Sequence, residues 1–133
     1  MKPGIERRLL QIAIALACLV PLTMGGLSVV RGVEVLKGVA PAPDLDSHFR
    51  YLSGIFLVLG IAFATCVPAI ERKGPRFRLL GAMVVAGGLA RLLSWYVVGA
   101  PGFGHRFGLA MELGVVPLLM LWQWRVARIN SAF

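Results

Sequence analysis

The sequence is poor in acidic residues and in the side chains that catalytic and metal sites use. Its 133 residues include six Asp and Glu against 14 Lys and Arg, with only two His and two Cys. Two histidines are too few for a histidine-based closed metal site, which needs three or four ligands. The hydrolase motifs GxSxG and HExxH are absent. We therefore expect no enzyme, no metal site and no cofactor.

Cysteine is also scarce, and its placement argues against redox chemistry. Cys18 and Cys66 both lie inside apolar runs, and no CxxC pair is present. A thiol redox centre of that type therefore has no support. We interpret both residues as buried free thiols that act as small apolar side chains.

Charge as a whole is low for a soluble protein. Charged residues make up 15% of the chain, whereas a soluble domain carries about a quarter. The net charge of +8 comes from basic residues at the ends of apolar runs, where they contact lipid headgroups. A nucleic-acid site needs a basic stripe on a soluble face. We therefore expect membrane lipids as partners and no nucleic acid.

Four long apolar runs predict an all-α integral membrane protein, a four-transmembrane-helix bundle that forms a single domain over residues 1–133. About 20 apolar residues in a helix cross the hydrocarbon core. The first run exceeds the apolar region of a signal peptide, so we interpret it as a retained helix that tolerates Pro21. The predicted helices span residues 9–30, 48–70, 77–98 and 107–124, with an outer loop at 31–47.

The basic residues are distributed unevenly over the two sides of these helices. Four fall on the side of the long loop: Arg31, Lys37, Arg50 and Arg106. Nine fall on the side of the termini: Lys2, Arg7, Arg8, Arg72, Lys73, Arg76, Arg78, Arg125 and Arg128. The positive-inside rule therefore predicts that both termini are cytoplasmic, which in a bacterial cell means a multi-pass protein of the inner membrane.

Two charges lie deep inside predicted helices, well away from their ends: Arg91 in the third and Glu112 in the fourth. From the helical rise, they lie roughly 12 Å and 7 Å below the same outer surface. An unpaired charge at such a depth is expensive, so we expect the two side chains to pair. The pair is either a structural lock between helices or part of a ligand site, and the residues alone leave both open.

The second helix is expected to bring further polar groups to this level. Asp46 and Arg50 are spaced i,i+4 with the acid first, the favourable order, and Asp44 to Ser47 offer N-cap side chains. Gly87 and Gly88 predict a close helix-packing face. We predict one outward-opening polar pocket that binds a ligand, formed by Asp46, His48, Arg50, Tyr51, Arg91, Ser94, Trp95 and Glu112.

Several of these residues also fit simpler roles. The Asp46–Arg50 pair is also typical of a solvated surface pair. Tyr51 has the character of an interface anchor. His48 has no second histidine beside it with which to hold a metal.

Three segments carry a resemblance to a known family: Asp44–Gly54, the Glu71–Arg72 turn, and Gly88–Ser94. Together they resemble the bacterial family described as domain of unknown function 4345, over nearly the whole chain. The resemblance implies a small four-helix membrane protein and assigns it no activity.

Three functions remain open at this point. The first is a membrane protein that binds a lipid or amphipathic ligand in the predicted pocket. The second is a structural or accessory subunit of a larger membrane complex. It would dock a membrane-protein partner or a second copy through small-residue faces such as Ala13/Ala17 and Gly60/Ala64. The third is a small proton-coupled transporter that uses Glu112, since an intramembrane carboxylate can relay protons.

Overall fold

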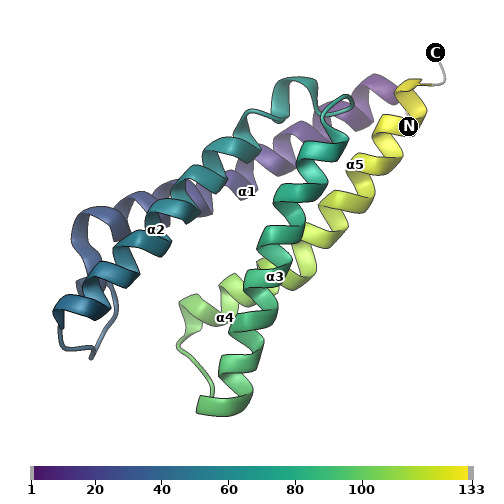
Figure 1. The fold of residues 1–133 in the computed structure, drawn as a ribbon. Helices are drawn as coiled ribbons and strands as arrows, with labels where there is room; N and C mark the ends of the chain where they lie inside the picture. Colours follow the sequence, from purple (N-terminus) through teal and green to yellow (C-terminus); the bar gives the residue numbers. More distant parts are fainter. Residues whose placement is uncertain (1, 132–133) are drawn as a thin grey trace. The chain divides into compact units, whose positions relative to one another are not determined.

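A computed structural model describes residues 2–131, and within that range the chain is helical with no strand. The elements are α1 Pro3–Arg31, η1 Gly32–Val35, α2 Pro43–Ala64, η2 Val67–Ala69, α3 Gly74–Val98, α4 Phe103–Ala110, η3 Met111–Val115 and α5 Val116–Ser131 (Figure 1). The segments α4, η3 and α5 follow one another without a break. The all-α prediction is confirmed.

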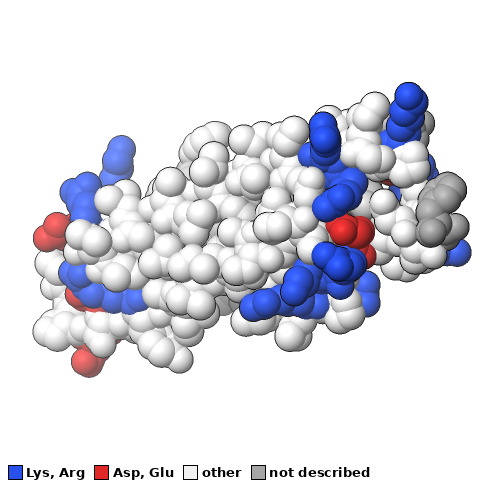
Figure 2. Space-filling model, turned by 90° about the horizontal axis from the view of Figure 1, so that it is seen from above, with Lys and Arg blue, Asp and Glu red and all other residues white. Residues whose placement is uncertain are grey.

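Four helical segments are long and apolar enough to cross a membrane: Pro3–Val35, Pro43–Ala69, Gly74–Val98 and Phe103–Ser131. On the face shown in Figure 2, charged side chains gather near helix ends and leave a broad uncharged surface over the middle stretches. This distribution matches that of a bilayer, because charge is unfavourable in the hydrocarbon core and favourable at the level of the headgroups. The chain is a multi-pass membrane protein.

The helices begin earlier than their apolar runs do. α2 begins at Pro43, α3 at Gly74 and α4 at Phe103, whereas the apolar patterns predicted residues 48, 77 and 107. Backbone hydrogen bonding continues through polar residues outside the hydrocarbon, and proline in the first turn favours a start there. The predicted N-caps are wrong for the same reason: Ala42 is the N-cap of α2, and Asp44 and Asp46 lie in its first turn.

The chain forms two compact units. The first comprises residues up to Gln11 together with the chain from Pro68 onward, and the second comprises Ile12–Val67. The long helix α1 therefore contributes to both. That the whole chain acts as one domain stays a prediction.

In the second unit, α1 and α2 form an antiparallel pair with very close backbone approach (Figure 1). A Cβ placed on Gly25 would lie 2.9 Å from the backbone nitrogen of Leu57, and one on Gly60 would lie 2.8 Å from Cγ of Pro21. Gly60 thus accommodates the proline inside α1, which continues as a helix through it. Gly60 thus packs against α1 within the chain, and docking of a partner helix on the small-residue faces stays a prediction.

The cysteines in this unit behave as expected. Cys18 and Cys66 are both buried. They fill apolar interior space, as small hydrophobic residues do.

In the first unit, a glycine at every seventh position of α3 faces the last helix. A Cβ on Gly74 would lie 3.2 Å from Nε2 of Gln123, one on Gly81 would collide with Met120, and one on Gly88 would lie 2.8 Å from Cβ of Glu112. A seven-residue repeat keeps one stripe of a helix against an antiparallel neighbour. The packing role predicted for Gly88 is confirmed, but Gly87 is exposed with nothing near it, so that part was wrong.

Candidate functional site

The two charges inside the apolar helices of the first unit meet, as predicted. Arg91 of α3 donates from Nε to Oε2 of Glu112 and from Nη2 to Oε1, both at 3.0 Å. This two-point geometry is the strongest form of the arginine–carboxylate bond. The Glu112 side chain is 12% exposed and that of Arg91 34%. The pairing satisfies a carboxylate that would otherwise be stranded among apolar side chains.

Local backbone structure brings Glu112 to this position. It lies in η3, a π-helical turn in which the N–H of Val116 bonds to the carbonyl of Met111, five residues back. Pro117 follows and has no N–H, so the carbonyl of Leu113 lacks its α-helical donor. A wider turn is one of the ways in which a helix accommodates such a break, and π-turns are frequent at functional sites.

A third side chain completes this cluster, and the sequence analysis missed it. Nη1 of Arg91 lies 2.8 Å from Nδ1 of His105 in α4. A guanidinium can only donate, so Nδ1 accepts and the neutral ring carries its proton on Nε2. His105, Gly108 and Glu112 are spaced i,i+3,i+7 on one helix face, which was the available signal. It was overlooked because the predicted helix began at residue 107. We call Arg91, His105 and Glu112 the arginine cluster.

An apolar groove lies on α3, and no residue of the arginine cluster lines it. It is open, has a volume of about 630 Å³ and is lined by Leu89, Leu92, Leu93, Trp95 and Tyr96. Trp95 is half-buried and stands one helical turn after Arg91. Of the lining residues, Trp95 is therefore the one that shares the helix face of Arg91, and the others lie on other faces of α3.

The predicted site residues Asp46 and Arg50 form a separate cluster in the second unit. Oδ2 of Asp46 accepts from Nε of Arg50 at 2.7 Å, and Oδ1 accepts from the backbone N–H of Val33 at 2.8 Å. Nη1 of Arg50 donates to the carbonyls of Val29 and Val30 at 2.7 and 2.9 Å. A cation at the C-terminal end of α1 also opposes the negative end of its dipole.

Gly32 explains why this second cluster closes. Its φ of +63° is in the left-handed region, and a Cβ there would collide with Asp46 and Arg50. The chain therefore turns from α1 into η1 at the one residue type that leaves room for the bridge.

The remaining predicted site residues make no side-chain polar contact with other described residues. His48 and Tyr51 are exposed on α2, and Ser94 is exposed on α3. The predicted set is thus divided between the two units, with Asp46, His48, Arg50 and Tyr51 in one and Arg91, Ser94, Trp95 and Glu112 in the other. That the two groups join in one pocket stays a prediction.

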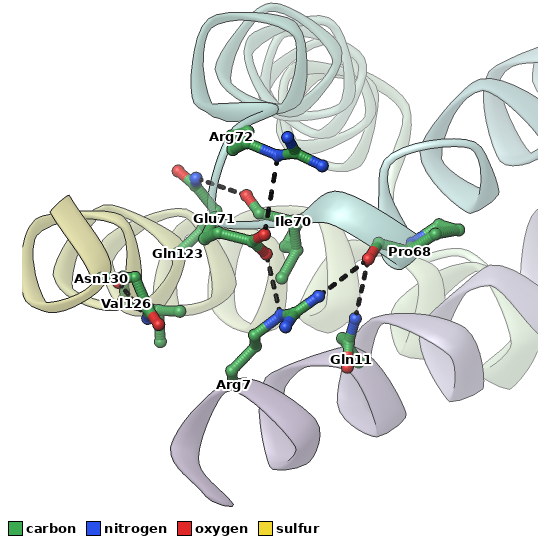
Figure 3. Close-up of polar contacts among 9 residues, drawn as sticks. All are labelled: Arg7, Gln11, Pro68, Ile70, Glu71, Arg72, Gln123, Val126 and Asn130. Carbon is green, nitrogen blue, oxygen red and sulfur yellow. Dashed lines mark hydrogen bonds and ion pairs between the residues drawn. The ribbon is translucent and has the colours of Figure 1, made fainter. Parts of the chain in front are cut away.

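A third group of polar contacts lies in the first unit and holds the turn before α3. The carbonyl of Pro68 accepts from Arg7 at 3.0 Å and from Gln11 at 3.3 Å, both on α1 (Figure 3). Gln123 of α5 donates to the carbonyl of Ile70 at 2.9 Å, and Glu71 pairs with Arg7 at 2.9 Å. These contacts join α1, the turn and α5, which no local sequence pattern predicted.

Comparison with known proteins identifies a family for this chain but no related protein of known function. No curated protein and no solved structure matches the chain. The sequence pattern of one family, described as Domain of unknown function (DUF4345), matches residues 9–123. That range covers most of both units and includes the Arg50–Asp46 and Arg91–Glu112 pairs. The chain therefore belongs to the DUF4345 family, a domain of unknown function.

Proposed function

We propose that this protein binds a lipid or another amphipathic molecule at the arginine cluster and along the apolar groove of α3. The observation that carries the proposal is that α3 carries both an arginine with unused hydrogen-bond donors and an open apolar groove. Ligand sites in general combine an apolar lining with a few convergent polar groups. The polar head would bind at Arg91 and His105, and the apolar body would lie along Leu92 and its neighbours.

The donors indicate what the head would carry. A guanidinium has five N–H groups, and the contacts to Glu112 and His105 engage one on each of its three nitrogens. Two N–H groups of Arg91 therefore remain, together with the Nε2–H of the exposed His105. Because Glu112 already neutralises Arg91, the site favours a head rich in acceptor oxygens, such as a phosphoester, a carboxylate or a carbonyl.

The membrane orientation is part of the same proposal. Nine basic residues on the side of the termini against four on the other side support a cytoplasmic location of the termini under the positive-inside rule. In a bacterial inner membrane the arginine cluster then lies in the outer half of the bilayer. The ligand would enter from the outer leaflet.

Native mass spectrometry of the detergent-extracted protein tests the proposal. We expect the wild type to retain an amphipathic molecule, and His105→Ala and Leu92→Asp each to lose it, because one removes a head contact and the other charges the groove. Arg106→Ala is the matched control, since Arg106 is an exposed neighbour outside the cluster. Equal retention by all four proteins would refute the binding role.

Proton-coupled transport is the second candidate, favoured by the position of Glu112. Glu112 lies in a π-turn, and Arg91 contacts both its carboxylate and the imidazole of His105. Two groups that can carry a proton are therefore held on the same guanidinium. Proton flux into proteoliposomes that disappears in Glu112→Gln would support this candidate. Unchanged flux in that variant would remove it.

A further inference from the structure

The end of the first unit that contains the start of α1, the turn before α3 and the end of α5 is strongly basic. The ion pairs of Glu6 with Arg125 and of Glu71 with Arg7 hold these three segments together. We call this the basic end and define it by the cations that those two pairs leave over: Lys2, Arg8, Arg72, Lys73, Arg76, Arg78 and Arg128.

The two carboxylates of the basic end are directed inward. The Glu6 side chain is 5% exposed and lies 2.7 Å from Nε of Arg125. The Glu71 side chain is 16% exposed and lies 2.9 Å from Nε of Arg7 (Figure 3). Of the remaining cations only Arg72 approaches a carboxylate, at 3.8 Å from Glu71. The two carboxylates are thus largely buried in ion pairs. Among the described residues, the charged groups exposed to solvent at this end are mainly cations.

The opposite end of the same unit differs. There, between the end of α3 and the first turns of α4, Arg106 is the only described Lys or Arg outside the arginine cluster. The excess of cations is therefore found at one end of the unit only. Its two glutamates are each paired with an arginine and leave the other cations without an acidic partner at salt-bridge distance among the residues that the structure describes, except for Arg72.

An aromatic residue marks the depth of the basic end. The guanidinium of Arg128 lies over the ring of Trp124, 4.7 Å from its centroid. Tryptophan is enriched at the level of lipid headgroups, and a stacked guanidinium keeps its charge at that level.

From these observations we infer that the basic end binds the headgroups of anionic phospholipids in the leaflet that it faces. Its cations lie on, or directly beside, helices long and apolar enough to cross a bilayer, so the chain itself holds them at headgroup depth. Clusters of Lys and Arg next to membrane helices attract anionic lipid. This site lies apart from the arginine cluster and does not depend on the function proposed there.

The experiment is a competition between two lipids for the delipidated full-length protein. Equal amounts of phosphatidylglycerol and phosphatidylcholine are added, and native mass spectrometry gives the ratio of the two among bound lipids. We expect the wild type to favour phosphatidylglycerol. The triple variant Arg8→Gln, Arg76→Gln, Arg78→Gln should lower that ratio about tenfold or more, because each basic residue shifts the partition several-fold. Arg106→Gln is the matched control and should leave the ratio unchanged.

A second measurement keeps the inference falsifiable if the triple variant folds poorly. Raising the salt concentration tenfold shortens the Debye length roughly threefold, which should lower the phosphatidylglycerol ratio of the wild type. The inference is overturned if the wild type binds the two lipids in equal amounts. It is also overturned if the preference for phosphatidylglycerol changes neither with salt nor with the triple substitution. A preference lost equally in Arg106→Gln overturns it as well, because that result would indicate a general effect of net charge.

Discussion

The Arg50–Asp46 pair and the Arg91–Glu112 pair join the same two chemical groups but use the rest of the guanidinium differently. Arg50 directs its other donor group to the backbone carbonyls of Val29 and Val30, which are fixed by the end of a helix. Arg91 directs its other group to the exposed side chain of His105, which is not fixed by backbone hydrogen bonds as a helix carbonyl is.

This comparison shows that an ion pair alone does not define a role. The cluster of Arg50 joins three consecutive elements, α1, η1 and α2, through backbone groups, so its contacts stabilise the turn between the two helices. The cluster of Arg91 joins two membrane-crossing helices, and one of its members is the exposed side chain of His105. A ligand can therefore compete with His105 for the donors of Arg91. Substitutions in the two clusters should therefore lower the stability of the fold by different amounts.

The largest loss of stability is expected from removing Arg91. Arg91→Ala leaves the carboxylate of Glu112 unpaired among apolar groups, which should destabilise the fold by about 3 kcal/mol. Thermal unfolding in detergent micelles measures this. The double variant Arg91→Leu, Glu112→Leu should be more stable than Arg91→Ala, because no stranded charge remains. A double variant less stable than the single one would contradict the argument.

The next largest effect is expected at Gly32. Gly32→Ala forces a side chain into the left-handed region, at about 1–2 kcal/mol, and also displaces the Asp46–Arg50 bridge. Gly38→Ala is the matched control, because Gly38 has a φ of +76° but nothing within 4 Å of its Cβ position. Gly32→Ala should therefore destabilise the protein more than Gly38→Ala does. Equal losses would show that the bridge contributes nothing beyond backbone strain.

A smaller loss is expected from Arg50→Lys. An ammonium keeps the charge but lacks the planar fork that reaches a carboxylate and two carbonyls together. The loss of one or two charge-assisted hydrogen bonds should lower stability by about 1–2 kcal/mol. Thermal unfolding of Arg50→Lys beside Arg106→Lys, an exposed cation outside both clusters, checks it. No difference between the two variants would mean that the carbonyl contacts are not stabilising.

The smallest effect on stability is expected from His105→Ala, at about 0.5 kcal/mol or less, because the residue is exposed and the Arg91–Glu112 bond remains. Under the proposed function the same variant should nevertheless lose the bound ligand. A large loss of stability would assign His105 to the fold and weaken the binding role.

Much of the architecture was readable from the chain. The four membrane-crossing segments and the pairing of Arg91 with Glu112 follow from one rule, that hydrocarbon rejects charge and unpaired polar groups. The helix ends were misplaced, because a helix continues beyond the hydrocarbon and leaves no hydropathy signal there. His105 was missed for that reason alone.

The sequence alone dictated that this chain crosses a membrane and that its buried arginine needs an acid, because transfer free energies depend on residue type and spacing. Only the tertiary structure decided which donors of each arginine remain available. The left-handed turn at Gly32, the π-turn at Glu112 and the glycine repeat of α3 set those contacts. Such contacts depend on backbone angles and on the rotation of one helix against another, which distant residues set together.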